Sequence, residues 1–245
     1  MNAPRLDRRD AVADEVARLR SHIQRIERTT RTGSAGATLP APDRIARLLP
    51  GGGLRAGTAY ALDRSMPLLT ELLAAPSQTG TWCAAIGMPE LGIEAAHAAG
   101  ADLDRLVLIP RPGERWLSVV ATVAEVVGLI AVRPGGRVRE QDAARIAARL
   151  RERGTVLLVQ GPWPQAEARL AVEDLRWSGL GDGHGHLERL EATVAVSHRQ
   201  AAGTRRGRVP LLGQPPAPSM IEAADAAADP PETSPAPPQL LRATG

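Results

Sequence analysis

The chain has 245 residues, 43% of them hydrophobic, which is enough for one α/β domain with a substantial core and additional terminal segments. All 30 basic residues are arginines, so every site that needs a lysine is excluded, including a phosphate-loop lysine and a Schiff base. The single cysteine excludes an internal disulfide, and no apolar run approaches the roughly 18 residues that span a membrane, so we expect a cytoplasmic protein. The net charge of +3 is mildly basic.

Residues 1–43 are predicted to form an amphipathic helix followed by a linker. Within residues 8–30, apolar side chains recur at spacings of 4, 3, 4 and 3, which is the a/d pattern of a helix seam: Val12, Val16, Leu19, Ile23 and Ile26. About three heptads are too few to define a coiled coil. Two interpretations therefore stay open, a helix docked on its own domain and a helix that binds a partner.

Residues 44–213 are predicted to form one α/β domain. Short apolar segments bounded by Gly, Pro or charged residues are the candidate strands: 58–63, 80–87, 105–110, 127–132, 155–160, 190–198 and 209–212. Helical patterns lie between them at 67–75, 89–99, 114–126 and 139–153, and Gly154 is a suitable C-cap for the last. This alternation predicts a mostly parallel sheet covered by helices on both faces. Residues 214–245 are rich in Pro and Ala and are predicted to be disordered.

The stretch A-L-D-R-S-M-P-L-L-T-E-L-L at 61–73 follows the first candidate strand, where a phosphate-binding loop would lie. Such a loop needs glycines, a lysine for the phosphates and a Ser or Thr for Mg²⁺, and this stretch has neither Gly nor Lys. Asp63 would repel phosphate, and Pro67 removes a backbone N–H. The strand at 127–132 ends at Arg133 instead of a metal-holding acid. We therefore expect no ATP hydrolysis, no catalytic residue, no cofactor and no metal.

Three segments resemble the core of the RecA fold: G-G-G-L-R-A-G-T-A-Y at 51–60, T-W-C-A-A-I-G at 81–87 and A-A-G-A-D-L-D-R-L-V-L-I-P-R at 98–111. In this resemblance, the positions of the nucleotide-binding Lys and Thr fall on Thr70 and Glu71, and the metal-binding acid falls near Arg133. The family's catalytic Glu corresponds to Glu90, in M-P-E-L. Without a nucleotide cradle, Glu90 is expected to have no catalytic role.

A narrower resemblance rests on the eroded nucleotide motifs, W-S-G-L-G-D-G-H-G-H-L at 177–187, R-R-G-R-V-P-L-L-G at 205–213 and the lysine-free composition. Over about residues 45–213 these are similar to the actinobacterial ImuA-prime family. The resemblance implies a non-enzymatic adaptor in damage-induced (SOS) mutagenic translesion synthesis. Implied partners are ImuB, a Y-family polymerase homologue without polymerase activity, and indirectly an error-prone C-family DNA polymerase, with RecA a further candidate. Two alternatives stay open: an ATPase with an unconventional site around Arg64 and Glu90, and an SOS-type cell-division inhibitor.

The strongest basic run, H-R-Q-A-A-G-T-R-R-G-R, contains Arg199, Arg205, Arg206 and Arg208. Guanidinium groups form bidentate contacts with phosphates, but no aromatic residue is interleaved to stack on bases. Two interpretations stay open: non-specific, salt-sensitive contact with DNA, and a solvated hairpin between two edge strands.

Three other groups of side chains are candidates for function. Trp163, in G-P-W-P after the fifth candidate strand, is a candidate partner-binding residue if its side chain is exposed. His184 and His186 with Asp182 suggest a metal site, but the ligands are too few, and we expect a flexible loop with a hairpin-like turn. Cys83 lies in a buried strand pattern and is predicted to be inert.

Overall fold

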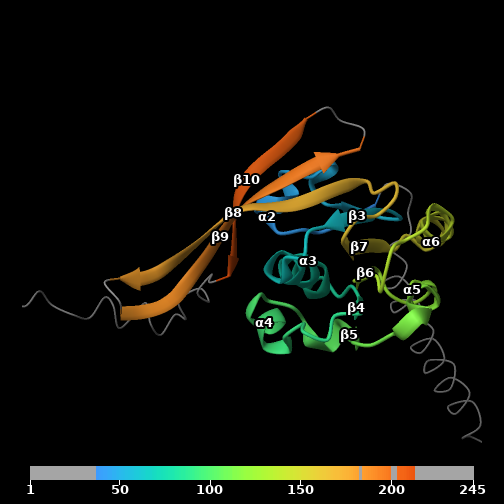
Figure 1. Cartoon of the computed structure of the whole chain (residues 1–245), viewed down its shortest axis with the longest axis horizontal. Coiled ribbons are helices and arrows are strands. Elements are labelled where there is room, and N and C mark those ends of the chain that lie inside the picture. Colours follow the sequence, from blue (N-terminus) through green and yellow to red (C-terminus); the bar gives the residue numbers. More distant parts are fainter. Residues whose placement is uncertain (1–36, 182–183, 200–202, 213–245) are drawn as a thin grey trace, which may run out of the picture. The chain divides into compact units, whose positions relative to one another are not determined.

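The computed structural model describes residues 37–181, 184–199 and 203–212 (Figure 1). Within them the main sheet has eight strands in the order β10-β9-β8-β3-β7-β6-β4-β5. Strand bounds are β3 (Ala59–Leu62), β4 (Cys83–Ile86), β5 (Leu106–Ile109), β6 (Leu129–Val132), β7 (Val156–Gln160), β8 (Ala168–Gly181), β9 (His184–His198) and β10 (Thr204–Leu212). Neighbours from β8 to β5 are parallel, whereas β9 is antiparallel to both β8 and β10. A separate two-stranded sheet pairs β1 (Thr38–Leu39) with β2 (Leu54–Arg55).

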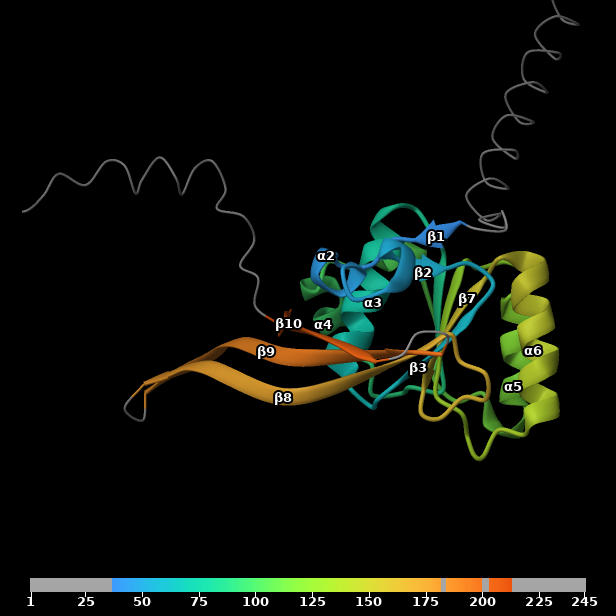
Figure 2. The ribbon, with the colours of Figure 1, turned by 90° about the horizontal axis from the view of Figure 1, so that it is seen from above.

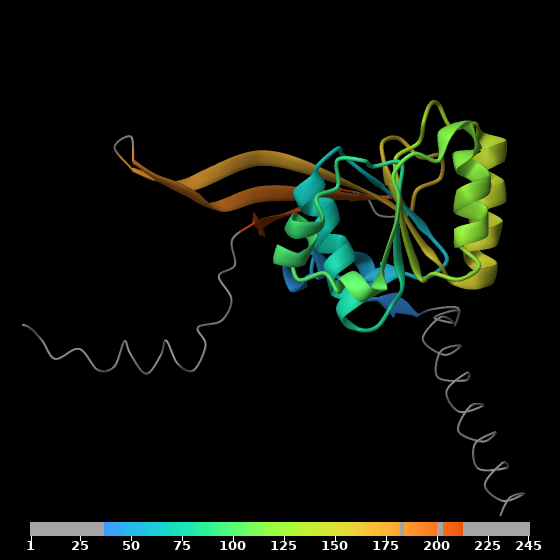
Figure 3. The ribbon, with the colours of Figure 1, turned by 90° about the horizontal axis from the view of Figure 1, so that it is seen from below.

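Helices cover both faces of the parallel part (Figures 2 and 3). One face carries α2 (Asp43–Ala46), α3 (Met66–Gln78) and α4 (Ile93–Ala98), and the other carries α5 (Trp116–Val123) and α6 (Glu140–Arg153). Short 3-10 turns are η1 (Pro50–Gly52), η2 (Leu103–Arg105) and η3 (Gly113–Arg115). The predicted α/β class, a mostly parallel sheet flanked by helices, is confirmed. Gly154 ends α6 in the left-handed conformation, as predicted.

The core is aliphatic and has two layers, one on each face of the sheet. In β3, Tyr60 and Leu62 face α3, whereas Ala59 and Ala61 face α5 and α6. All four are buried, and the same holds for every residue of β4, β6 and β7. Strands buried on both faces have no polar side to alternate with, which is why the sequence shows them as continuous apolar runs.

The connection between β3 and α3 is short and contains only residues 63–65. Ser65 is the N-cap of α3, and its hydroxyl oxygen accepts the backbone N–H of Leu68 at 3.3 Å. Pro67 lies in the first turn of the helix, where backbone N–H groups have no acceptor within the helix, so its missing N–H removes no hydrogen bond. The chain therefore passes from strand to helix with no loop that could wrap around a phosphate.

β8 was not predicted from the sequence. It pairs with β3 only through residues 168–170 and then continues with β9 as an antiparallel extension, which we call the arm (residues 173–190) (Figure 1). β10 pairs along the other edge of β9 as far as Leu190, so the arm is two-stranded only beyond that point. A bulge interrupts the β8–β9 register at Asp174, which has a φ of +48°. Another irregularity lies between Pro210 and Leu212 in β10. The flexible loop with a hairpin-like turn expected for G-L-G-D-G-H-G-H (179–186) is corrected in part: strand pairing continues to Gly181 and resumes at His184, and the antiparallel pairing agrees with a hairpin.

Two predicted segments lie outside the described residues. The helix seam of Val12, Val16, Leu19, Ile23 and Ile26 falls in residues 1–36, and the Pro-rich tail falls in residues 213–245. In the described part of the chain, none of the helices combines the length and the apolar character needed to cross a membrane.

Candidate functional site

The residues that follow β3 are engaged in internal contacts. One carboxylate oxygen of Asp63 lies 3.0 Å from a guanidinium nitrogen of Arg169, and the other accepts the backbone N–H of Val172 at 3.3 Å. Both partners belong to β8, so Asp63 fastens the base of that strand where it leaves the parallel sheet. The acid predicted to repel phosphate is thus a structural link between β3 and β8.

Thr70 and Glu71, at the positions aligned with the nucleotide-binding Lys and Thr, lie inside α3. The Thr70 side chain is 3% exposed, and its hydroxyl donates to the carbonyl oxygens of Met66 (3.2 Å) and Pro67 (2.9 Å). Burial raises the pKa of Glu71 from its usual value near 4.5 to about 7. The short link after β3 explains this placement, because α3 begins at Met66 and carries both residues into its second turn.

A guanidinium group joins the segments that meet at the carboxyl edge of the parallel strands. Arg133, directly after β6, donates from Nε (3.0 Å) and Nη2 (2.5 Å) to the side-chain oxygen of Gln160 at the end of β7. Its Nη1 forms an ion pair with Glu90, in the loop after β4. Its Nη2 also lies 3.7 Å from the sulfur of Met66, the first residue of α3. We call Met66, Glu90, Arg133 and Gln160 the closed edge.

The closed edge is largely desolvated. Gln160 is 2% exposed and the Arg133 side chain is 20% exposed, whereas Glu90 is about half exposed. Burial, and secondarily the nearby charge of Arg64, lower the pKa of Arg133, but a guanidinium stays protonated in proteins. A permanent cation bound to Gln160 and Glu90 therefore stands directly after β6, at the position where the sequence resemblance to the RecA fold would place a metal-binding acid.

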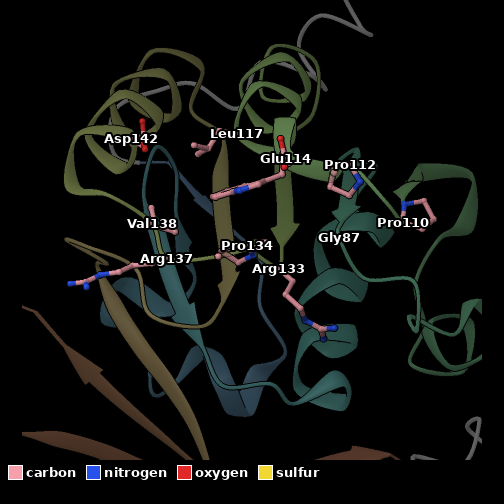
Figure 4. Close-up of a pocket in the computed structure, with 14 residues that line it drawn as sticks. Gly87, Pro110, Pro112, Glu114, Leu117, Arg133, Pro134, Arg137, Val138 and Asp142 are labelled. Atoms are coloured by element: carbon pink, nitrogen blue, oxygen red, sulfur yellow. The ribbon is translucent and has the colours of Figure 1, made fainter.

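A hollow of about 570 Å³ opens beside the closed edge, on the α5 and α6 side (Figure 4). It lies between the Pro- and Gly-rich loops after β5 and β6, and Trp116 and Leu117 form apolar parts of its wall. In Figure 4 the Arg133 side chain extends away from this hollow toward the teal helix α3. The lining carries charges of both signs, Glu114 and Asp142 with Arg137, so the hollow has no marked preference for an anion or a cation.

The predicted arginine cluster is divided between two faces of the sheet. Val209 and Leu211 of β10 point into the core, so alternation along the strand places Arg205 on the same face and Arg206 and Arg208 on the opposite one. All three are exposed. Arg206 is bound to Glu173 of β8, with Nε 3.0 Å from one carboxylate oxygen.

A second hollow, of about 750 Å³, lies at the base of β8 and β9 next to this cluster. Its lining combines Arg64 after β3, Arg169 of β8 and Arg199 after β9 with the Ser197 hydroxyl and part of Trp163. It thus connects the end of β3 with the face that carries Arg206 and Arg208.

The tryptophans differ in exposure. Trp163 is 7% exposed and packs in the core layer of α5 and α6, so it lacks the exposed side chain that a partner-binding residue needs. Trp177 in the arm is 51% exposed, and Leu175, on the same face of β8, is 56% exposed. Sequence reasoning did not identify these two as a surface, because β8 itself was not recognised.

Of the remaining candidates, some lie outside the described residues and the others form no cluster that could hold a metal. Side chains of His184 and His186, and Asp182 entirely, lie outside what is described. His198 Nε2 lies 3.3 Å from Glu167 Oε1, and the described residues contain no group of three or more His, Cys, Asp or Glu that could hold a metal. Burial raises the pKa of Cys83 to about 12, which fits the predicted inert thiol.

Two known groups of sequences are similar to this chain. Residues 47–165 match the family model described as the MT3502 N-terminal domain. The chain is also similar to a protein of Mycobacterium tuberculosis (strain ATCC 25618 / H37Rv) described as uncharacterized protein Rv3395c. The two are 37% identical over 135 residues, which make up 54% of this chain and 66% of the relative, just under two thirds of its length. The family match contains the whole closed edge and ends before β8.

Proposed function

We propose that the chain is a non-enzymatic accessory subunit of a damage-induced mutagenic translesion-synthesis complex. It acts as an adaptor for an ImuB-like Y-family polymerase homologue and, through it, for an error-prone C-family DNA polymerase, with RecA as a further candidate partner. The sequence resemblance to the ImuA-prime family supports this proposal, and the similarity to a mycobacterial protein is consistent with an actinobacterial family.

The closed edge is the observation that carries the non-enzymatic part. A nucleotide site on a parallel sheet needs free backbone N–H groups and a metal at the carboxyl ends of the strands. Here Ser65 and Pro67 start α3 directly after β3, and Arg133 binds Gln160 and Glu90 in the same place. Opening it would leave the buried Gln160 oxygen without its guanidinium partner, which is unfavourable. A scaffold held shut in this way suits binding of proteins better than turnover of nucleotides.

The arm supplies a described surface for the partner. Leu175 and Trp177 are exposed on β8, the edge strand of the arm, and large exposed apolar side chains of this kind are frequent interface anchors. Beyond Val172 the outer edge of β8 has no strand neighbour among the described residues, so backbone groups are also accessible there. We propose that the ImuB-like partner contacts this arm, together with the helix seam predicted for residues 8–30.

Calorimetric titration of the full-length chain tests the proposal. We expect heat from the ImuB-like partner and none from ATP·Mg²⁺ in the same buffer. The Leu175→Ser/Trp177→Ser variant should bind the partner at least about tenfold more weakly, since anchor residues often contribute 2 kcal/mol or more. A matched control, Ile93→Ser/Val126→Ser, removes apolar side chains of similar exposure elsewhere and should bind normally. Micromolar ATP binding would contradict the proposal and favour the ATPase interpretation.

A further inference from the structure

One face of the β8–β10 sheet is covered by none of the helices in the described part of the chain. The opposite face packs on α2 and α3 through Val194, Val196 and Val209. The uncovered face carries the alternate residues of each strand, and we call it the basic face. Its arginines and hydroxyl residues up to the bulge at Asp174 are Arg169, Thr193, Ser197, Arg199, Thr204, Arg206 and Arg208, and the acids Glu173 and Glu191 share the same face.

The guanidinium groups of the basic face fall into two classes. Arg169 and Arg206 are fixed by carboxylates, at 3.0 Å from Asp63 and from Glu173. In the described part of the chain, no carboxylate forms an ion pair with Arg64, Arg199 or Arg208, and all three are exposed. The first class is held in position, and the second is free to bind an anion.

The 750 Å³ hollow lies at one end of this face and is bordered by both classes. Arg64, Arg169, Arg199 and Ser197 line it. Asp63 lines it as well, but its carboxylate is paired with Arg169. Gly161, with a φ of +133°, leaves the backbone of the β7–β8 connection close to the opening. A row of donors from β10 to β3 therefore ends in a recess of a volume that suits one nucleotide.

We propose that the basic face binds the sugar–phosphate backbone of single-stranded nucleic acid, with one nucleotide in the hollow. Guanidinium groups pair with phosphate through two hydrogen bonds, and Ser and Thr hydroxyls commonly add phosphate and sugar contacts. A single strand can bend into a recess that a stiff duplex cannot enter. The face exposes no aromatic ring among its described residues, so binding is predicted to be independent of base sequence.

The test measures fluorescence anisotropy of a labelled oligothymidylate of about 30 nucleotides, with the full-length chain over a series of salt concentrations. The variant is Arg199→Gln/Arg208→Gln. The matched control is Arg145→Gln/Arg151→Gln, which removes the same charge from exposed positions of α6. We expect the affinity of the variant to fall by about tenfold or more at low salt. The slope of log K against log salt concentration should become shallower by about 1.4, because two phosphate contacts are lost and each contributes about 0.7 for a single strand. The control should remain within about twofold of wild type.

Three results would overturn the proposal: no binding by wild type, equal losses in variant and control, or equal affinity for duplex of the same length. Circular dichroism shows whether each variant is folded. If Arg199→Gln/Arg208→Gln is misfolded, Arg64→Gln replaces it, because Arg64 lies outside the β8–β10 hairpins. The proposal does not depend on the adaptor function. Partner binding is expected to be unchanged in Arg199→Gln/Arg208→Gln, so the two proposals fail separately.

Discussion

The closed edge and the basic face belong to one sheet, and arginine is central to both. In the closed edge the guanidinium is bound within the chain, whereas in the basic face some guanidinium groups are exposed. Arg133 is mostly buried, and its N–H groups bind Gln160 and Glu90 within the chain. Arg199 and Arg208 are exposed and have no carboxylate partner among the described residues. The same side chain therefore acts as a structural cross-link where its hydrogen bonds are satisfied and as a binding group where they are not.

The two tryptophans give the sharpest test of this difference between the packed parallel part and the exposed arm. Trp163→Ala should lower the free energy of unfolding by about 3 kcal/mol or more, because it empties a buried site in the α5 and α6 layer. Trp177→Ala should change it by less than about 0.5 kcal/mol. Urea denaturation of both variants measures this, and similar losses would mean that the arm is part of the cooperative core.

Gly87 tests how tightly the closed edge is packed. Its φ is +76°, and an added Cβ would lie 2.7 Å from the carbonyl oxygen of Arg133. Gly87→Ala should therefore destabilise the chain by about 2 to 4 kcal/mol, combining backbone strain with displacement of Arg133. Gly113→Ala is the control, since its φ is +65° but the added atom meets nothing within 4 Å, and about 1 kcal/mol is expected. Equal losses in thermal or urea unfolding would show that the approach to Arg133 is unimportant.

Arg133 itself separates a structural role from a blocking role. Arg133→Met keeps the apolar length of the side chain but leaves the buried Gln160 oxygen without its donor, so we expect a loss of about 1 to 3 kcal/mol. Arg137→Met, on the exposed loop that follows, should be within about 0.5 kcal/mol of wild type. Neither variant should gain ATP binding in calorimetry. A gain in Arg133→Met would mean that this guanidinium alone closes an otherwise intact nucleotide site.

Glu71 gives the smallest expected effect, and it depends on pH. Its pKa is raised to about 7 in the folded chain, so folding favours its protonated form. The folded chain then binds more protons than the unfolded chain between about pH 4.5 and 7, and stability from this group declines as pH rises through that window. Glu71→Gln should raise the free energy of unfolding by about 1 to 2 kcal/mol at pH 8, a value reduced from the full effect of the pKa shift because Glu71 is partly exposed. Near pH 4 the substitution should leave the free energy of unfolding unchanged. A stability difference that does not change with pH would contradict this assignment.

The parallel part was predictable from sequence, because its strands are buried on both faces. Such strands appear in the sequence as continuous apolar runs between Gly, Pro and charged residues. The arm was not, because residues 173–178 are all exposed and the bulge at Asp174 interrupts the alternation of apolar and polar residues along the strand. For the same reason β10 was predicted to start at 209 instead of Thr204, and Arg205 could not be separated from Arg206 and Arg208.

The closed edge was predictable only in part. The loss of the phosphate loop and of the acid after β6 is visible in residues 61–73 and at Arg133. What replaces them is not, because Glu90 and Gln160 lie 43 and 27 residues away from Arg133 in the chain and meet it only through the order of β4, β6 and β7. Local patterns indicate which groups are missing, whereas the partners of a long side chain depend on tertiary topology.

The irregularities of β8 and β10 bear on how the chain behaves at high concentration. A long exposed ribbon is a template for aggregation through strand pairing between copies. The bulge at Asp174 kinks one rim of the ribbon, Pro210 removes a backbone donor from the outermost strand, and Arg206 and Arg208 place like charges along it. Features of this kind are how natural sheets resist fibril growth, so the molecule can present its arm to a partner while resisting self-assembly.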